Sequence, residues 1–95
     1  MNIGSAIIKL RKEKKVRQYI LARKIGITQT YLSQVEGNIK KNPSEKILKK
    51  ICDILKISFA RLYFEALEES DIAEERRELF ELIKPIIQKI FTQIK

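Results

Sequence analysis

The sequence predicts an all-α protein, in which five short helices form one body and a further helical segment follows. Apolar residues recur at intervals of three and four along nearly the whole chain, as on one face of a helix, and no stretch alternates as a half-buried strand would. The 95 residues include only three Gly and two Pro, so few positions interrupt a helix. This length suits one compact domain with an appendage.

The first three helices are predicted from apolar stripes and from residues that favour helix ends. One stripe covers residues 2–14, and a second, shorter one covers residues 18–25. Gly26 ends the second helix, because glycine adopts the left-handed backbone conformation without steric cost. Thr28 then caps a third helix over residues 28–36 with its side-chain oxygen.

The end of the third helix and the start of the fourth are marked by short polar runs. The third helix is expected to end at Gly37 and Asn38, since both residues tolerate a positive φ. Asn42 is expected to cap the fourth helix, with Pro43 at its first position and Glu45 folding back as in a capping box.

A fifth helix, capped by Ser58, completes a body that we place in residues 1–66. The sequence holds a single cysteine, Cys52, so neither an intramolecular disulfide nor a cysteine-rich zinc site is possible. Cys52 lies between isoleucines and is expected to be a small core residue. The large residues of the expected core are Leu10, Leu21, Leu32, Leu48 and Leu55.

The remaining residues, 67–95, differ from the body in composition and are expected to form a C-terminal helical segment. Acidic residues dominate as far as Glu81, and the apolar density rises beyond it. Pro85 lacks an N–H group and clashes with the preceding turn. We therefore expect a kink or a break there, with separate helices over residues 71–84 and 85–94.

Charge is distributed unevenly and indicates a polyanionic partner. Residues 1–50 carry 13 Lys and Arg against 3 Asp and Glu, whereas residues 51–95 carry 7 against 9. A basic half favours nucleic acid or an anionic membrane surface, although a solvated charged face would also account for it. No secretory signal and no run of the ~20 apolar residues needed to cross a bilayer is present. A cytoplasmic protein without membrane contact is expected.

The spacing of small and apolar residues over 18–37 is that of a helix-turn-helix. Ala22 suits a close crossing of two helices, and Gly26, four residues later, suits the turn. Apolar residues occupy the positions that would fill the wedge between the helices: Leu21, Ile25, Ile27, Leu32 and Val35. Each feature alone is weak, but all seven in register indicate DNA binding in a basic chain.

Residues 3–62 resemble the Cro/C1-type (XRE) family of phage and bacterial repressors. The resemblance rests on Leu10-Arg11, Gln18, Ala22, Gly26, Thr28-Gln29, the run from Tyr31 to Glu36, and Asn42-Pro43-Ser44. It implies a lambda-repressor-like fold and an internal ion pair between Arg11 and Glu36. The family usually has Asn-Gly after this glutamate, whereas the chain has Gly37-Asn38, so the end of the third helix is expected to differ.

The solvent face of the third helix carries the residues expected to read DNA bases. Gln29, Thr30, Ser33 and Gln34 are uncharged and can both donate and accept hydrogen bonds. Glutamine bonds adenine bidentately in the major groove, and the threonine methyl group can contact that of thymine. A surface helix usually presents Lys and Glu instead, and residues 28–35 contain neither.

Phosphate contacts are expected around the same helix pair. Gln18 begins the second helix, where a side chain and the helix N-terminus can both meet a phosphate. Asn38 and the lysines after it follow the third helix, where the resemblance implies backbone contacts. The expected phosphate-binding set is Gln18, Arg23, Thr28, Asn38, Lys40 and Lys41.

The C-terminal segment is too apolar for a helix free in water, so its apolar face must be covered. It could complete the core or form a subunit interface, and we favour the interface because the five-helix body has its own core. A dimer would also place two recognition helices on two half-sites. The expected interface comprises Leu79, Ile83, Ile86, Ile87, Ile90, Phe91 and Ile94.

These features predict a homodimeric transcriptional regulator, a repressor, that binds an inverted-repeat operator on double-stranded DNA. The alternative is an antitoxin-like or antirepressor-like interaction protein, whose C-terminal helix binds another protein. An enzyme is not expected, because the chain has no His, no phosphate loop and no nucleophile motif. No metal, cofactor or small-molecule ligand is expected either.

Overall fold

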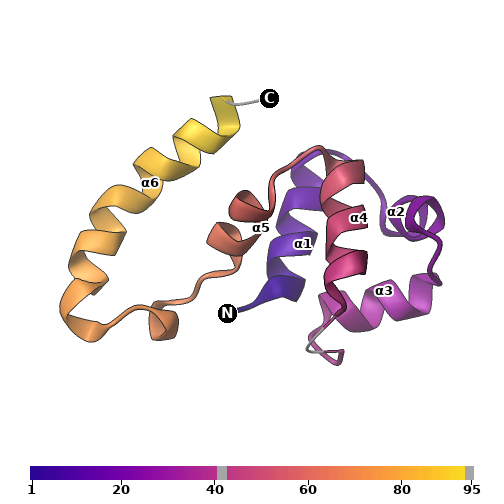
Figure 1. Cartoon of the computed structure of the whole chain (residues 1–95), viewed down its shortest axis with the longest axis horizontal. Coiled ribbons are helices and arrows are strands. Elements are labelled where there is room, and N and C mark those ends of the chain that lie inside the picture. The colour runs from indigo at the N-terminus through magenta and orange to yellow at the C-terminus, as the bar shows by residue number, and fades with distance from the viewer. Residues whose placement is uncertain (41–42, 94–95) are drawn as a thin grey trace.

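The computed structural model describes residues 1–40 and 43–93, which form helices and no strand. The body comprises α1 (Ile3–Glu13), α2 (Gln18–Ile25), α3 (Gln29–Glu36), α4 (Glu45–Leu55) and α5 (Phe59–Ala66). Two 3-10 turns, η1 (Glu69–Asp71) and η2 (Glu74–Arg76), lead to α6 (Arg77–Gln93). Figure 1 shows α6 at the opposite end of the molecule from α2 and α3. The predicted all-α class is confirmed.

Three of the predicted helix ends are confirmed by their hydrogen bonds and backbone angles. Gly26 ends α2 with φ 79°, in the left-handed region. The Thr28 hydroxyl oxygen accepts a hydrogen bond from the N–H of Tyr31 at 3.0 Å. Ser58 accepts one from the N–H of Arg61 at 3.1 Å. These local signals suffice because Thr28 and Ser58 each satisfy an N–H group of the first turn that they cap, and glycine adopts the left-handed conformation at a helix end without steric cost.

The prediction for the start of α4 is wrong by two residues. The cap is Ser44, whose hydroxyl oxygen accepts from the N–H of Ile47 at 3.2 Å. Because α4 begins at Glu45, Pro43 precedes the helix and Glu45 is not in the third position that a capping box needs. Serine caps as well as asparagine does, so the run from Asn42 offered two caps. Asn42 itself lies outside the described residues.

The core of the body lies between the five helices, with α1 against α3 and α5, and α2 against α3 and α4. Cys52 belongs to this core, as predicted, with 3% of its surface exposed. The other buried apolar residues described are Ala6, Ile7, Leu10, Leu21, Ala22, Ile25, Leu32, Val35, Leu48, Ile51, Leu55, Leu62 and Ala66. Every large core residue expected from the sequence is among them.

Ion pairs join α1 to α5 along their antiparallel faces. Lys9 Nζ lies 2.7 Å from Glu65 Oε2, and the Glu65 side chain is only 6% exposed. One helical turn further along, Arg61 Nη2 lies 2.6 Å from Glu13 Oε1. Lys9 and Glu13 on α1 thus each face a residue of opposite charge on α5. These two ion pairs fix the register of the two helices.

The N-terminus is joined to the segment that follows α5. The amino group of Met1 lies 2.6 Å from Asp71 Oδ2 and 3.0 Å from Glu68 Oε1. Hydrogen bonding to this amine holds the pKa of the Asp71 carboxyl below its ordinary value, and the same bond raises the pKa of the amine. Both groups are exposed, so the contact positions the chain rather than adding much stability.

The predicted break at Pro85 is wrong, because α6 runs without interruption from Arg77 to Gln93. Pro85 removes one hydrogen bond of the helix. Both halves of α6 nevertheless pack on the same side chain of the body: the ring centroid of Phe64 lies 6.0 Å from that of Phe80 and 5.9 Å from that of Phe91. This shared contact offsets the local cost of the proline. The helix also begins later than residue 71, after the two 3-10 turns.

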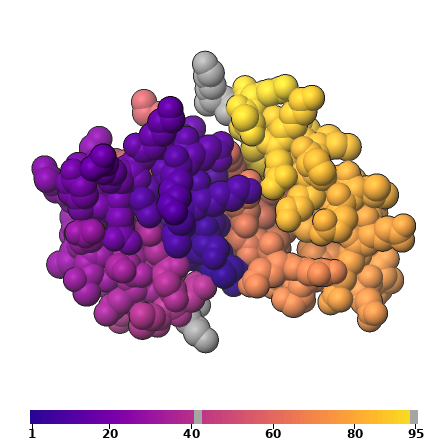
Figure 2. Space-filling model, turned by 180° about the vertical axis from the view of Figure 1, so that it is seen from behind, coloured from indigo at the N-terminus to yellow at the C-terminus, as the bar shows by residue number. Residues whose placement is uncertain are grey.

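The helix α6 lies alongside the body without entering its core. Figure 2 shows the C-terminal segment as a separate mass beside the body, and none of the described residues of α6 is buried. No described residue of α6 therefore belongs to the buried core of the body. Within the described ranges, every helix is too short or too polar to span a lipid bilayer.

Candidate nucleic-acid interface

The two helices α2 and α3 form a tight unit around a short turn. Gly26 takes the left-handed conformation, and the N–H of Ile27 donates to the carbonyl oxygen of Ala22 at 3.0 Å, which reverses the chain at once. Ala22 is 2% exposed at the contact between the helices. The wedge positions expected from the sequence are buried at Leu21, Ile25, Leu32 and Val35 and half-buried at Ile27. This is the geometry of a helix-turn-helix.

The residues expected to read bases lie together on the outer face of α3. Gln29, Thr30 and Ser33 are exposed, and Gln34 is half-buried. With Gln18 from the start of α2, these four side chains line one open hollow on the surface. The hollow is therefore lined only by uncharged polar residues that can donate and accept hydrogen bonds.

A chain of hydrogen bonds runs from this hollow into the interior. Gln29 Nε2 donates to Gln18 Oε1 at 3.2 Å, and Gln18 Nε2 donates to Glu36 Oε1 at 3.1 Å. Gln18 was expected to contact phosphate. In the structure its amide is hydrogen-bonded to a residue at each end of α3, which leaves it one free N–H.

The chain ends at an ion pair between Arg11 and Glu36, the two residues that the sequence places together. Arg11 Nε donates to Glu36 Oε2 at 2.9 Å, and Arg11 Nη2 donates to Glu36 Oε1 at 3.0 Å. The side chain of Glu36 is 4% exposed and that of Arg11 is 12% exposed. Arg11 Nη1 also donates to the carbonyl oxygen of Val16 at 3.1 Å. The pair thus joins α1, α3 and the turn before α2.

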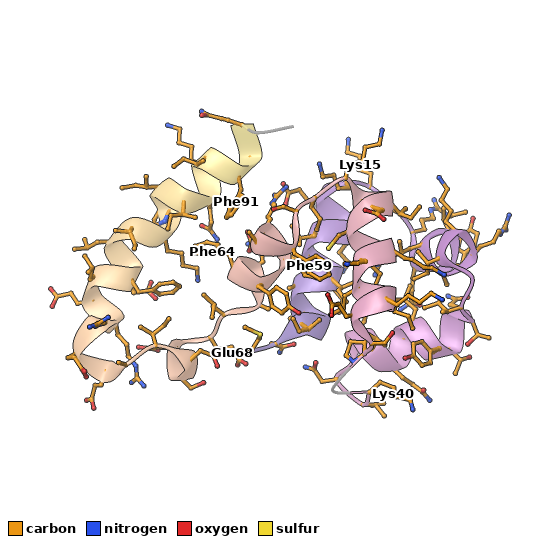
Figure 3. All side chains as sticks on the ribbon, in the orientation of Figure 1. Lys15, Lys40, Phe59, Phe64, Glu68 and Phe91 are labelled. Atoms are coloured by element: carbon orange, nitrogen blue, oxygen red, sulfur yellow. The ribbon has the colours of Figure 1, made fainter. Side chains whose placement is uncertain are left out.

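Residues expected to contact phosphate differ in how free they are to do so. Arg23 is exposed on α2. Lys40 lies beside the end of α3 (Figure 3), with its Nζ 6.0 Å from the centre of the Tyr31 ring. The Thr28 oxygen accepts the capping bond, and its hydroxyl hydrogen remains available to a phosphate. Lys41 lies outside the described residues.

Asn38 has a structural role that sequence analysis missed. Its φ of 61° ends the segment in the left-handed conformation, whereas Gly37 has φ −87°, so only one of the two expected residues adopts a positive φ. Asn38 Nδ2 donates to Asn2 Oδ1 at 2.7 Å, and Asn2 also caps α1. The Asn38 side chain therefore fastens the end of α3 to the start of α1 instead of pointing freely outward.

The acidic segment and α6 lie far from α3, the helix whose outer face carries this hollow (Figure 1). Of the expected interface residues, Phe91 packs on Phe64 of the body (Figure 3), and Ile87 is half-buried. Four others are well exposed, as is Leu82, which sequence analysis did not include: Leu79 58%, Leu82 67%, Ile83 39%, Ile86 60% and Ile90 50%. Ile94 lies outside the described residues. Two sides of α6 are thus apolar, and one of them is uncovered.

Comparisons with known proteins agree with this geometry. Over 72 residues the chain is 39% identical to the HTH-type transcriptional regulator SinR of Bacillus licheniformis, covering 76% of this chain and 61% of that protein. Over 66 residues it is 39% identical to SinR of Bacillus subtilis (strain 168), covering 70% and 60%. Over 91 residues it is 29% identical to the immunity repressor protein of Bacillus phage phi105, covering 83% and 62%.

The chain spans about three-fifths of the length of these curated relatives. No solved structure matches it. Residues 7–62, more than half of the chain, match the helix-turn-helix family, and they contain the α2–turn–α3 unit that carries the polar hollow. The chain therefore belongs to the helix-turn-helix family, of the Cro/C1 (XRE) type.

Proposed function

We propose that the chain is a sequence-specific DNA-binding transcriptional regulator that represses transcription, in the cytoplasm, from an inverted-repeat operator. The observation that carries this proposal is the hollow on α3, whose lining is polar, uncharged and exposed at the outer face of a helix-turn-helix. The names of the relatives, which are transcriptional regulators and an immunity repressor, support it. No catalytic role is proposed.

Base reading is assigned to Gln29, Thr30, Ser33 and Gln34. A helix in the major groove presents its outer side chains to base edges, where glutamine pairs with adenine and a threonine methyl group packs on thymine. None of these residues belongs to the buried core, since Gln29, Thr30 and Ser33 are exposed and Gln34 is half-buried. Their chemistry is therefore available for recognition.

Phosphate contacts are assigned to groups on α2 and at the two ends of α3. Arg23 on α2 and Lys40 after α3 carry positive charge and are exposed, and Gln18 and Thr28 each retain one hydrogen-bond donor beside the helix N-termini. Lys41 follows Lys40 in the sequence and is assigned with it. For Asn38 we retain a contact through the second N–H of its side-chain amide, because the first donates to Asn2 and its backbone N–H donates to the carbonyl oxygen of Val35. Such contacts fix orientation and supply affinity without reading sequence.

Dimer formation is assigned to α6, in a C-terminal segment of residues 67–95 that follows a DNA-binding unit of residues 1–66. The uncovered side of α6 carries Leu79, Ile83, Ile86 and Ile90, spaced four, three and four residues apart. This is the heptad spacing of a helix that packs against another helix. A second copy of α6 would cover these side chains, and Ile87, Phe91 and Ile94 would border the contact.

The test is selection of bound sites from random duplex DNA, with the oligomeric state measured on the same sample. The proposal expects an enriched inverted repeat with half-sites about one helical turn apart, ~34 Å, and a dimer by light scattering. Binding without any enriched sequence would contradict sequence-specific regulation. A monomer whose α6 captures a different protein would favour the antitoxin-like or antirepressor-like alternative.

A further inference from the structure

The side chain of Gln29 is the outer end of a hydrogen-bonded chain whose inner end can only accept. A carboxylate has no hydrogen to donate, and the carboxylate of Glu36 takes two hydrogen bonds from Arg11. Gln18 must therefore turn its Nε2 toward Glu36, as it does at 3.1 Å. The ion pair thus determines which way round the Gln18 amide lies.

The orientation of Gln18 determines that of Gln29 in turn. With Gln18 Nε2 directed at Glu36, the oxygen of the same amide faces Gln29 and can only accept. Gln29 donates to it from Nε2 at 3.2 Å. Gln29 is left with one N–H and its Oε1, in a fixed order along the hollow.

From this geometry we propose that Glu36 is a positioning residue for base recognition: held by Arg11, it sets through Gln18 the order in which Gln29 presents donor and acceptor to the DNA. The inference rests on the proposed function of the α3 face. It assigns a role in sequence specificity to a carboxylate that is 4% exposed and lies outside the hollow.

The order of donor and acceptor matters because bases differ in it. In the major groove adenine presents the N7 acceptor beside the N6 donor, whereas guanine presents two acceptors, N7 and O6. One N–H and one oxygen in a fixed order match adenine in one orientation. If the Gln29 amide could turn over, its donor and acceptor would change places. Gln29 would then also bind the edges of other base pairs. The hydrogen bonds that run from Glu36 through Gln18 to Gln29 therefore favour A·T over T·A at the base pair that Gln29 contacts.

Stability alone does not require the bond between Glu36 and Gln18. The buried carboxylate already has a bidentate partner in Arg11, which is the strong arrangement for such a pair. Glu65 provides a comparison within the same protein: it is 6% exposed, pairs with Lys9 of α1, and has no link to α3. It serves as a matched control.

The experiment compares Glu36→Gln with Glu65→Gln on a panel of operators. Both changes replace a buried carboxylate by an amide of the same shape, but only the first gives residue 36 an N–H group and frees Gln18 to turn over. The base pair read by Gln29 is located first, as the pair at which Gln29→Ala loses its preference. Affinities for operators with A·T, T·A and G·C at that pair are then measured for each variant.

Wild type and Glu65→Gln are expected to prefer A·T there by about tenfold or more, within the range for a bidentate pair. Glu36→Gln is expected to lose this preference to within about twofold, while keeping its preferences elsewhere. An unchanged preference in Glu36→Gln, with affinity lowered equally for all operators as in Glu65→Gln, would overturn the inference.

A second variant guards against unfolding of Glu36→Gln. Gln18→Ala leaves the ion pair intact and cuts the chain at its middle, so it is expected to lose preference at the same base pair. If Gln18→Ala retains that preference, the inference is wrong. If Gln29→Ala loses no preference at any pair, the assignment of the α3 face fails instead, and the two failures are thereby distinguished.

Discussion

Gly4 of α1 lies directly against the backbone of Glu36 at the end of α3. A Cβ atom on Gly4 would lie 2.5 Å from the carbonyl oxygen of Glu36, and equally close to that of Val35. Both neighbours are backbone atoms of α3, so neither can rotate away. The absence of a side chain at residue 4 therefore sets how closely α1 approaches the helix that carries the polar hollow.

Gly4→Ala is expected to destabilise the protein by about 1–3 kcal/mol, the usual cost of forcing an extra group into a packed contact. In an unhindered helix the same change would stabilise by roughly 0.5–1 kcal/mol, so the sign of the change tests the contact. Urea unfolding followed by circular dichroism measures it.

Gly37→Ala provides the control for this measurement. Its φ is −87° and an added Cβ would lie 3.3 Å from the carbonyl oxygen of Ser33, so the loss of stability is expected to be clearly smaller than that of Gly4→Ala. A Gly4→Ala variant as stable as wild type would show that α1 and α3 can separate without cost.

Gln34→Ala is expected to weaken binding to the selected operator by about 1–3 kcal/mol and to leave binding to random DNA nearly unchanged. The half-buried side chain of Gln34 lines the hollow with Gln29 and holds no part of the core. Fluorescence anisotropy on both DNAs gives the two affinities. Equal losses on both would mean that Gln34 supplies affinity and not sequence recognition.

Binding is expected to weaken steeply with salt, because residues 1–50 carry 13 basic residues against 3 acidic ones. Log K should fall with log salt concentration by roughly 0.9 per phosphate contact. Lys40→Ala should reduce this slope by about one and weaken operator and random DNA alike. A slope near zero for the wild-type protein would contradict binding through phosphate contacts.

The parts of the fold that sequence analysis predicted are those set by local chemistry. Gly26 and Thr28 end and begin helices through bonds to their own neighbours, and apolar spacing alone identified the buried faces of α2 and α3. Gly4 also left a signal, since an isolated glycine within a helical stripe often marks close packing. Its partner on α3 could not be inferred, because 32 positions separate Gly4 from Glu36 in the sequence.

The contacts that sequence analysis missed join distant segments. Gln18 and Asn38 are polar residues near α3, and nothing in their spacing shows that each bonds another side chain of the body. Pro85 interrupts helices in general, but here both flanking halves pack on Phe64. The structure at each of these residues depends on contacts with segments far away in the sequence. A single sequence does not show which distant segments meet.

The thiol of Cys52 is expected to make stability fall with rising pH in the alkaline range. Burial, together with the neighbouring charge of Asp53, raises its pKa from 9.0 to about 11. Between these values the unfolded chain loses the thiol proton and the folded chain keeps it, so the unfolded state binds fewer protons and the free energy of unfolding decreases as pH rises.

The measurement is urea unfolding between pH 8 and pH 11 for wild type and Cys52→Ala, since lysines and tyrosines titrate in the same range in both proteins. The wild-type free energy of unfolding should decrease relative to that of the variant across this range. If the free energy of unfolding depended on pH in the same way for both proteins, the thiolate of Cys52 would be as well solvated in the folded protein as in the unfolded chain.

The apolar side of α6 is expected to hold two copies of the chain together. Ile83 and Ile90 are 39% and 50% exposed in the single chain and lie two turns apart on the same side of the helix. An uncovered seam of apolar side chains of this kind is typical of a surface that contacts another protein. The double change Ile83→Asp with Ile90→Asp places two carboxylates in the seam without altering α2 or α3. We expect this variant to be a monomer and the wild type a dimer, as measured by sedimentation.

The matched control is Gln88→Asp with Thr92→Asp, which adds the same two charges to α6 outside the heptad positions of the seam and should remain dimeric. The monomeric seam variant should keep its helical circular dichroism, because none of the described residues of α6 is buried. It should also bind operator weakly, since two DNA-binding units held in one dimer bind their half-sites with a high effective concentration that separate monomers lose.

If the seam variant stays dimeric with its helices intact, the interface lies elsewhere. If it unfolds throughout, α6 contributes to the stability of the body through Phe64, and the uncovered seam is not its main role.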